Sequence, residues 1–306
     1  MHKRLIFVAV AAGLLLAGCG QKQATTKTPA TRTVTTTAGK TKIPAHPKRV
    51  VATVYTDELL ALGVHVVGST QMDLANPWLS NNQTKGIKNL GNAMSQEAIL
   101  KLDPDLIVTS NEADVKKLKK IAPVLYVPYG STGDVYQTLA KFGTYMNRTK
   151  KAKAVATDLK QTAKTEATKL KAAGIDPAKT TVSFFDLQAN KLYVDGATWG
   201  RGGSAIVTAM GFKLNAASQK VETGTGYKQI STEATPTYAG DWLFFSNTNG
   251  TKQTLSDLKA NPVWKQLPAV KANHVIELPF TKMYYYDPIA VKGQMRLVTK
   301  TMLAQQ

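Results

Sequence analysis

Short apolar runs alternate with amphipathic segments along the first half of the chain. Strands are predicted where four to six residues, mostly apolar, are bounded by turn-forming residues, at 50–54, 64–68, 105–110 and 124–127. Apolar residues at helical spacing lie between these runs, over 57–63, 96–102 and 116–121. Strands that alternate with helices in this way predict an α/β lobe with a mostly parallel sheet.

One segment breaks this alternation. From Arg148 to Ala173 there is neither Pro nor Gly. Apolar residues recur there at intervals of three and four, at Ala152, Val155, Leu159, Ala163, Ala167 and Leu170. The spacing predicts one helix with a single apolar stripe, capped by Asn147 and ended by Gly174. Such a helix is about 40 Å long, which suits a rigid link between two lobes better than an exposed coiled coil.

The alternating pattern then starts again. Further strands are predicted at 181–185, 191–194, 241–245 and 274–278, and helices at 204–210, 262–267 and about 288–303. We therefore expect an α/β fold in which two α/β lobes with mostly parallel sheets are bridged by one long α-helix. The N-terminal lobe is assigned to residues 41–146, the bridging helix to 147–174 and the C-terminal lobe to 175–306.

A repeated phrase indicates that the two lobes are related units. Glu97 starts a predicted short helix eight residues before Asp105, which opens a strand. Glu233 stands in the same way eight residues before Asp241. Equivalent glutamates are therefore expected on the surfaces of both lobes.

The N-terminus has the pattern of an export signal. A basic start is followed by an apolar run from Leu5 to Leu15, too short to span a bilayer, and then by Leu16-Ala17-Gly18-Cys19. We interpret residues 1–19 as a lipoprotein signal peptide with Cys19 lipidated; an ordinary signal peptide with an incidental cysteine is the alternative. The protein is then expected on the extracytoplasmic face of the cell membrane of a Gram-positive bacterium. Residues 20–40, rich in Thr, Lys, Gln and Ala, are predicted to be a flexible tether.

Charge and composition exclude several classes of function. The net charge of +19 comes mostly from scattered lysines, whereas nucleic-acid readers favour clustered arginines, so no nucleic-acid partner is expected. His46, His65 and His274 are isolated, and the single cysteine is assigned to lipid, which argues against direct metal capture. The segment 202–206 is not a GxSxG elbow, and no nucleotide-binding motif occurs, so an enzyme is not expected. A wall adhesin is a further alternative.

Seven motifs in order carry a resemblance that covers roughly residues 40–304. They lie at 43–51, 58–64, 89–91, 97–99, 102–107, 121–123 and 261–271. Together they resemble the periplasmic-type binding proteins for iron–siderophore complexes and vitamin B12, the solute receptors of ABC importers. The resemblance implies two lobes joined by one long helix, and a receptor that is not an enzyme, uses no cofactor and acts as a monomer with the transmembrane subunits of an ABC permease.

Trp199-Gly200-Arg201-Gly202-Gly203 is similar to the hydroxamate-siderophore receptors of Gram-positive bacteria. That similarity implies that Trp199 and Arg201 face a ferric siderophore. Its iron is already wrapped in six oxygens, so the protein supplies a flat apolar wall and a donor for the hydroxamate oxygens rather than metal ligands. We interpret the flanking glycines as allowing the backbone to approach a bulky ligand. Haem, a catecholate siderophore or vitamin B12 are the alternative ligands.

Other aromatic residues are candidates for the same cleft. The predicted ligand-binding tyrosines are Tyr193, Tyr129, Tyr227, Tyr285, Tyr284 and Tyr55, and one or two of Tyr284, Tyr285 and Tyr286 should face the ligand. Trp242 and Trp264 are expected in the core, and Trp78 fits either place. In the family that the chain resembles, glutamates at the positions of Glu97 and Glu233 dock on arginine pockets of the permease. The alternative is that both are solvated residues at helix starts.

Overall fold

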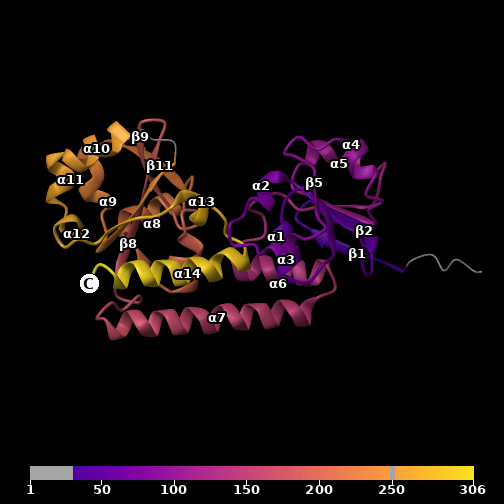
Figure 1. Ribbon diagram of the computed structural model, residues 1–306, viewed down its shortest axis with the longest axis horizontal. Coiled ribbons are helices and arrows are strands. Elements are labelled where there is room, and N and C mark those ends of the chain that lie inside the picture. Colours follow the sequence, from indigo (N-terminus) through magenta and orange to yellow (C-terminus); the bar gives the residue numbers. More distant parts are fainter. Residues whose placement is uncertain (1–29, 249–251) are drawn as a thin grey trace, which may run out of the picture.

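The computed structural model describes residues 30–248 and 252–306 and has two lobes joined along one side (Figure 1). Helix α7 (Thr149–Ala172) runs beneath both lobes, and the last helix, α14 (Pro288–Leu303), packs on it. The prediction of two α/β lobes bridged by one long helix is therefore confirmed. The bounds of α14 are those that the sequence pattern predicts.

The N-terminal lobe is built on a five-stranded parallel sheet. The strands lie in the order β5 (Lys88–Asn89), β4 (Val66–Ser69), β3 (Val50–Ala52), β6 (Leu106–Thr109) and β7 (Val124–Tyr126). Val50 and Ala52 belong to one core cluster, with α1 (Thr56–Ala61) and α6 (Val135–Tyr145). Val51 points to the other face, where α4 (Gln96–Leu100) and α5 (Glu112–Leu118) pack. Helices thus cover both faces, as parallel sheets require. Short helices α2 (Gln71–Leu74) and α3 (Asn81–Thr84) follow β4.

The C-terminal lobe repeats this core and adds an antiparallel edge. β8 (Thr181–Gln188), β12 (Trp242–Asn247) and β13 (Val275–Glu277) are parallel, like β3, β6 and β7. β9 (Lys191–Asp195) and β11 (Tyr227–Ile230) pair antiparallel beside β8, and β10 (Lys213–Leu214) pairs parallel with it. The connecting helices are the π-helix η1 (Ser204–Ala209), α8 (Ala216–Glu222), the 3₁₀ turn η2 (Thr232–Ala234), α9 (Thr235–Tyr238), α10 (Lys252–Ala260), α11 (Pro262–Gln266), α12 (Pro268–Lys271) and α13 (Phe280–Met283).

The repeated aspartates have the same role in both lobes. The carboxylate of Asp105 accepts the backbone N–H groups of Lys48 (2.6 Å) and Arg49 (2.9 Å), just before β3. The carboxylate of Asp241 accepts the backbone N–H and the hydroxyl of Thr181, both at 2.7 Å, where β8 begins. Each aspartate therefore ties the start of one central strand to the start of its neighbour. We call Asp105 and Asp241 the strand-start aspartates.

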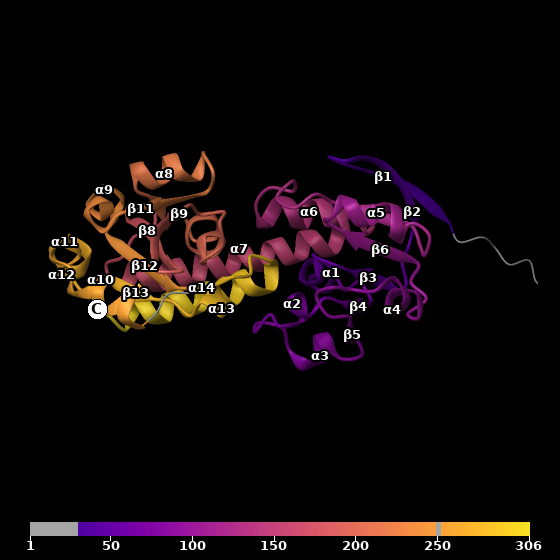
Figure 2. The same cartoon turned by 90° about the horizontal axis from the view of Figure 1, so that it is seen from above.

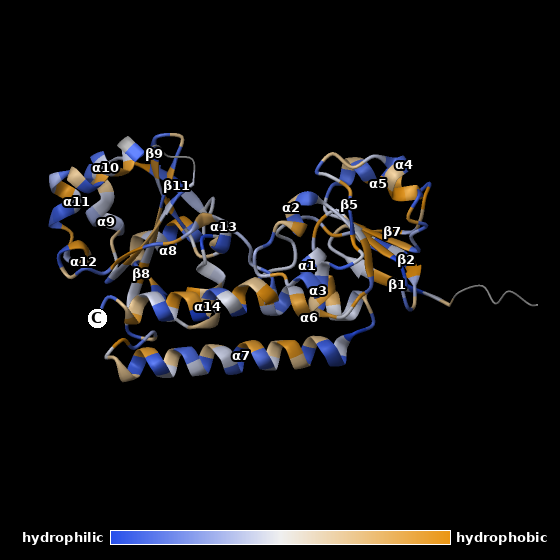
Figure 3. Ribbon diagram, in the orientation of Figure 1, coloured by the Kyte–Doolittle hydropathy of each residue, from blue (hydrophilic) through white to orange (hydrophobic). Residues whose placement is uncertain are grey.

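The stripe predicted on α7 connects the cores of the two lobes. Ala152 packs in the N-terminal core, whereas Leu159, Ala163 and Leu170 pack in the C-terminal core. Figure 3 shows hydrophilic residues alternating with apolar ones along this helix. The predicted cap is wrong: Arg148 occupies the N-cap position, and Asn147 has a left-handed backbone (φ 54°) instead.

The predicted tether is wrong for its second half. β1 (Thr31–Thr36) and β2 (Gly39–Pro44) form an antiparallel hairpin at the outer edge of the N-terminal lobe (Figure 2). Val34 and Ile43 are buried in the N-terminal core, and the Arg32 guanidinium donates to the carbonyls of Thr144 and Tyr145. These contacts, together with the pairing of the two strands, order a segment of mostly polar composition.

The predictions for the signal peptide, for Cys19 and for the first half of the tether lie outside the described residues. Within residues 30–248 and 252–306, no helix combines the length and the apolar content needed to cross a bilayer.

Candidate functional site

The cleft between the lobes holds a cavity of about 630 Å³, which we call the cleft cavity. It is lined by Tyr129 from the N-terminal lobe and by Gln188, Thr198, Trp199, Gly200, Arg201, Thr248, Phe280, Tyr284 and Tyr286. A smaller hollow of about 80 Å³, the side pocket, shares Tyr129, Tyr284 and Tyr286 with it. The structure thus brings together Trp199, Arg201, Tyr129 and Tyr284 of the predicted site.

Trp199 forms an aromatic wall with two predicted tyrosines. It is 44% exposed, and its ring centroid lies 4.4 Å from that of Tyr227 at an angle of 33°. Tyr193 lies behind this pair, with its centroid 6.3 Å from that of Tyr227. Tyr193 and Tyr227 do not line the cavity themselves but support the indole that does. A half-exposed indole that packs against a second ring is a ready contact surface for an apolar ligand face.

The loop that carries Trp199 has a left-handed backbone over Gly200 (φ 92°), Arg201 (φ 56°) and Gly202 (φ 85°). A Cβ atom on Gly202 would lie 2.2 Å from Cε of Met283, and one on Gly203 would lie 2.0 Å from the Ala197 carbonyl oxygen. These two glycines are therefore required because the loop packs closely on its own protein. Of the two glycines that flank Arg201, Gly202 therefore has Met283 beside it, whereas Gly200 lines the cavity, and close approach to a ligand stays a prediction there.

Arg201 is buried and held by carboxylates. Only 7% of its surface is exposed, and its Nε and Nη2 atoms donate to Oδ2 of Asp186 at 3.1 and 2.7 Å. Oδ2 of Asp195 lies 3.7 Å from Nε, and the guanidinium sits 4.8 Å from the centroid of the Phe280 ring. Burial raises the pKa of Asp195 to about 7, although the charge of Arg201 opposes that rise. Arg201 is thus fixed in the wall of the cavity.

The remaining predicted tyrosines face the side pocket. Tyr285 lines it and donates its hydroxyl to the carbonyl of Met72 at 2.8 Å. Tyr55 is 4% exposed, has a left-handed backbone (φ 64°) and donates to the carbonyl of Pro128 at 3.2 Å. Tyr129 is 65% exposed and meets Tyr286 edge-on at 6.0 Å.

Several lining residues escaped the sequence reasoning, among them Gln188, Thr248 and Phe280. One or two members of the run Tyr284-Tyr285-Tyr286 were expected to face the ligand, and Tyr284 and Tyr286 line the cavity. Gln188 ends β8 and Thr248 directly follows β12. The carboxyl ends of parallel strands are where ligands bind in open α/β sheets, so that position was the available signal.

Four carboxyl groups line the side pocket, and none was predicted as a site residue: Asp57, Glu58, Asp73 and Asp287. Asp57, Glu58 and Asp287 are each at most 5% exposed. The amide nitrogen of Asn76 donates to Oδ2 of Asp57 at 3.1 Å and to Oδ2 of Asp287 at 3.0 Å. Burial, reinforced by the neighbouring carboxylates, raises the pKa of Asp57 to about 10, and burial raises that of Asp287 to about 6. We call these residues the acidic cluster.

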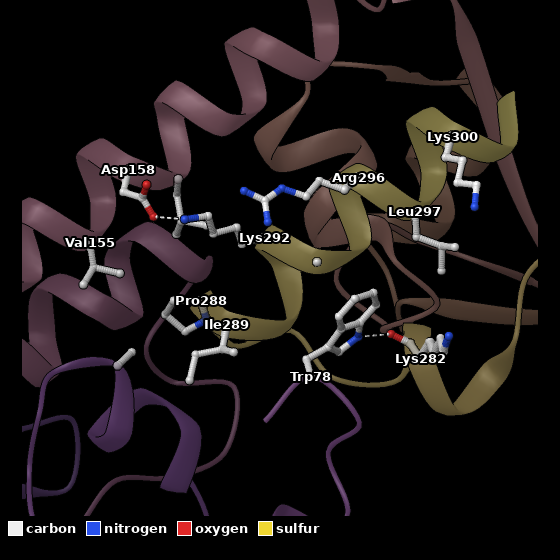
Figure 4. Close-up of a pocket in the computed structure, with 13 residues that line it drawn as sticks. Trp78, Val155, Asp158, Lys282, Pro288, Ile289, Lys292, Arg296, Leu297 and Lys300 are labelled. Atoms are coloured by element: carbon white, nitrogen blue, oxygen red, sulfur yellow. Dashed lines mark hydrogen bonds and ion pairs between the residues drawn. The ribbon is translucent and has the colours of Figure 1, made fainter. Parts of the chain in front are cut away.

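A second large hollow, of about 660 Å³, lies between α7 and α14 (Figure 4). Trp78 borders it and donates its indole N–H to the carbonyl of Lys282 at 2.7 Å. Lys292 pairs with Asp158 across the groove at 2.5 Å. None of the predicted ligand-binding residues lines this groove, so it is distinct from the cleft cavity. Trp242 and Trp264 are buried, as expected for core residues.

The two predicted docking glutamates lie in matching local settings. Glu97 stands in the first turn of α4 after Ser95; its side chain is 75% exposed and pairs with Lys101 at 2.8 Å. Glu233 is exposed in η2 after Ser231. Hydrogen bonds from its own backbone and from the side chain of Ser231 lower the pKa of Glu233. Both carboxylates are therefore available on the surface.

Comparison with known proteins agrees with this architecture. The profile described as periplasmic binding protein matches residues 50–281. The iron(3+)-hydroxamate-binding protein YxeB of Bacillus subtilis is 37% identical over 306 residues, which cover 98% of this chain and 93% of that protein. FhuD of the same organism, also an iron(3+)-hydroxamate-binding protein, is 34% identical over 86% of this chain and 84% of its own length. The structure of FhuD2 from Staphylococcus aureus with bound ferrioxamine B has a TM-score of 0.72 at 26% identity, covering 85% of this chain and 99% of that one.

The chain belongs to the periplasmic binding protein family. It is therefore a substrate-binding component of an ABC transporter and not an enzyme.

Proposed function

We propose that this protein binds ferric hydroxamate siderophores in the cleft cavity and delivers them to an ABC permease for iron uptake. The observation that carries the proposal is the placement of Trp199 and Arg201 together in the wall of that cavity. Its volume of about 630 Å³ is within the range of small-molecule sites, which is roughly 300–1,000 Å³. The names of YxeB and FhuD, with bound ferrioxamine B in FhuD2, support a hydroxamate as the ligand.

Different residues of the cavity contact different parts of the ligand. The indole of Trp199, held by Tyr227, offers a flat apolar face to the outer carbons of the chelate. Arg201 presents a fixed positive charge to the hydroxamate oxygens, while Asp186 and Asp195 hold it in place. Tyr129, Tyr284 and Tyr286 complete the aromatic lining. The iron is cargo and needs no ligand from the protein.

The first test removes the aromatic wall. Trp199→Ala deletes a contact surface that is 44% exposed, so we expect affinity for ferrichrome and ferrioxamine B to fall at least about tenfold. The free energy of unfolding should change by no more than about 1 kcal/mol. Isothermal titration calorimetry measures the affinity, and Trp78→Phe, in the other groove, is the matched control. Unchanged affinity in Trp199→Ala would show that the ligand binds elsewhere.

We further propose that the receptor is a monomer, lipid-anchored through Cys19 on the extracytoplasmic face, and that Glu97 and Glu233 orient it on the permease. Both carboxylates are exposed and occupy equivalent places in the two lobes. Exposed charge pairs guide orientation more than they add affinity.

The docking role predicts a separation of binding from transport. Glu97→Ala with Glu233→Ala should leave siderophore affinity unchanged and abolish uptake of radioactive ferric siderophore by cells whose only copy is the variant. Glu112→Ala with Glu277→Ala, one exposed glutamate in each lobe, is the control and should retain uptake. Normal uptake with the first pair would contradict the docking role.

A further inference from the structure

The acidic cluster is unusual for so basic a chain. The protein has 39 Lys and Arg residues against 20 Asp and Glu, yet four carboxyl groups meet in the side pocket. Among the described residues, the ion pairs involve other carboxylates, and no Lys or Arg pairs with Asp57, Glu58, Asp73 or Asp287. Buried carboxylates normally have a cationic or hydrogen-bonding partner, because burial without one is costly.

One oxygen of the cluster has no partner at all in the described structure. Oδ1 of Asp57 is buried and accepts no hydrogen bond, although Asp57 is only 5% exposed and lines the side pocket. Both amide hydrogens of Asn76 are already engaged, one by Asp57 Oδ2 and one by Asp287 Oδ2. The cluster therefore has a buried, unused acceptor on a residue that lines the hollow, and Asn76 cannot serve it.

Aromatic rings complete the walls of this hollow. Tyr55, Tyr129, Tyr284, Tyr285 and Tyr286 all line the side pocket together with the carboxyl groups. The face of a tyrosine ring attracts a cation, and the combination of aromatic faces with carboxylates is suited to an organic ammonium group. The volume of about 80 Å³ has room for such a group and an adjoining methylene, since a water molecule occupies about 30 Å³.

We propose that the side pocket is a subsite for the protonated primary amine of a linear ferric hydroxamate, so that the receptor prefers the cationic form of such a siderophore to its neutral derivative. This inference rests on the proposed function. Because the side pocket shares Tyr129, Tyr284 and Tyr286 with the cleft cavity, the chelate can lie against Trp199 while its tail reaches the acidic cluster.

The titration of the cluster gives this binding mode a signature. Burial and the charges of Asp287, Glu58 and Asp73 raise the pKa of Asp57 to about 10, so at pH 7.5 its carboxyl holds a proton. The polar and titratable groups that face it are these three acids, Asn76 and the tyrosines of the pocket. An ammonium group in the pocket favours the ionised carboxylate and so displaces that proton.

The test compares two ligands that differ only in the amine. The full chain, purified in detergent, is titrated with ferrioxamine B and with ferrioxamine B acetylated at its terminal amine; ferrichrome, which has no amine, is the reference. We expect the free amine to bind at least about tenfold more tightly than the acetylated form. In calorimetry with buffers of different ionisation enthalpy, proton release should accompany the amine ligand only.

Variants assign the preference to the cluster. Asp57→Asn should reduce the ratio of the two affinities to about two or less, while ferrichrome affinity stays unchanged and shows that the variant is folded. Asp73→Asn should lower the ratio in the same direction, and Asp114→Asn, a carboxylate on α5 remote from the cleft, should leave it intact.

Two results would overturn the inference: equal affinities for both ligands in the wild type, or a preference that survives both Asp57→Asn and Asp73→Asn. If none of the three hydroxamates binds, the proposed function itself fails.

Discussion

On the C-terminal wall of the cleft, Asp186 and Asp195 are each 1% exposed and both lie against Arg201. On the N-terminal wall, Asp57 and Glu58 are almost as deeply buried, at 5% and 4%, but lie against other carboxyl groups. The first wall carries its own counter-charge, although Oδ2 of Asp195 accepts no hydrogen bond. On the second wall no cation pairs with the acids; burial and the neighbouring carboxylates raise the pKa of Asp57 to about 10, and its Oδ1 accepts no hydrogen bond. Similar burial of acids is therefore balanced by a cation on one side and by a raised pKa on the other.

The largest loss of stability is expected when the positive charge of Arg201 is removed from the C-terminal wall. Arg201→Ala leaves Asp186 and Asp195 buried without a cation, so we expect the free energy of unfolding to fall by about 3–5 kcal/mol. Urea denaturation at pH 7.5 measures this change. Arg296→Ala, in the groove between α7 and α14, is the control and should cost less than about 1 kcal/mol. A loss for Arg201→Ala as small as that of the control would mean that the ion cluster is not needed for stability.

Replacing Asp57 on the other wall should raise the free energy of unfolding instead of lowering it. The pKa of Asp57 is about 10 in the folded protein and near 4 in the unfolded chain. Between these values the unfolded chain has released this proton while the folded protein retains it, so stability falls as the pH rises. Asp57→Asn lacks this titration and should be more stable than the wild type at pH 8, by at least about 1 kcal/mol.

The pH series also separates the two walls. The pKa of Asp195 is raised only to about 7, because Arg201 opposes the effect of burial. The titration of Asp195 therefore lowers the free energy of unfolding as the pH rises to about 7, whereas the titration of Asp57 continues to lower it toward pH 10. The free energy of unfolding, measured by urea denaturation at several pH values from 5 to 9, should change less with pH above pH 7 in Asp57→Asn than in Asp114→Asn. An equal dependence on pH in both variants would contradict the raised pKa.

The smallest expected difference concerns the ends of the sheets, where the lobes are alike. Asp105→Ala and Asp241→Ala each remove two hydrogen bonds at the start of a central strand. Each should lower the free energy of unfolding by about 1–2 kcal/mol, and the two losses should be similar. Equal losses, measured by urea denaturation, would support the conclusion that the lobes differ at the cleft and not at the end of each sheet where the central strands begin. A loss in one lobe alone would show that the two aspartates are not equivalent.

Local periodicity accounts for the parts of the fold that the sequence predicted well. The stripe on α7 and the bounds of α14 follow from apolar spacing that each segment carries by itself. The hairpin of β1 and β2 was missed because its strands contribute few large apolar side chains to the core, Val34 and Ile43, and because it relies on contacts with residues far along the chain.

The candidate site was predictable where a motif marks it and not where tertiary contacts make it. Trp199 and Arg201 were found from their motif, and both line the cavity. The partners of Arg201 were missed because the predicted strands stopped at residues 185 and 194, one residue before Asp186 and Asp195. Asp57 and Glu58 have the pattern of acids at the start of a helix, which are ordinarily solvated. In the folded protein Asn76 and Asp287, which lie elsewhere in the chain, meet Asp57 in the same pocket.

The strand-start aspartates have a consequence for redesigning the receptor. Each fixes the register of its lobe at the end of the sheet away from the carboxyl ends of the strands, where the ligand loops emerge. Grafting loops from another receptor onto the carboxyl ends of β8 and β12, or of β3 and β6, therefore leaves the anchoring of the strands intact. We therefore expect the loops at the carboxyl ends of the strands to tolerate redesign without loss of the sheet beneath them.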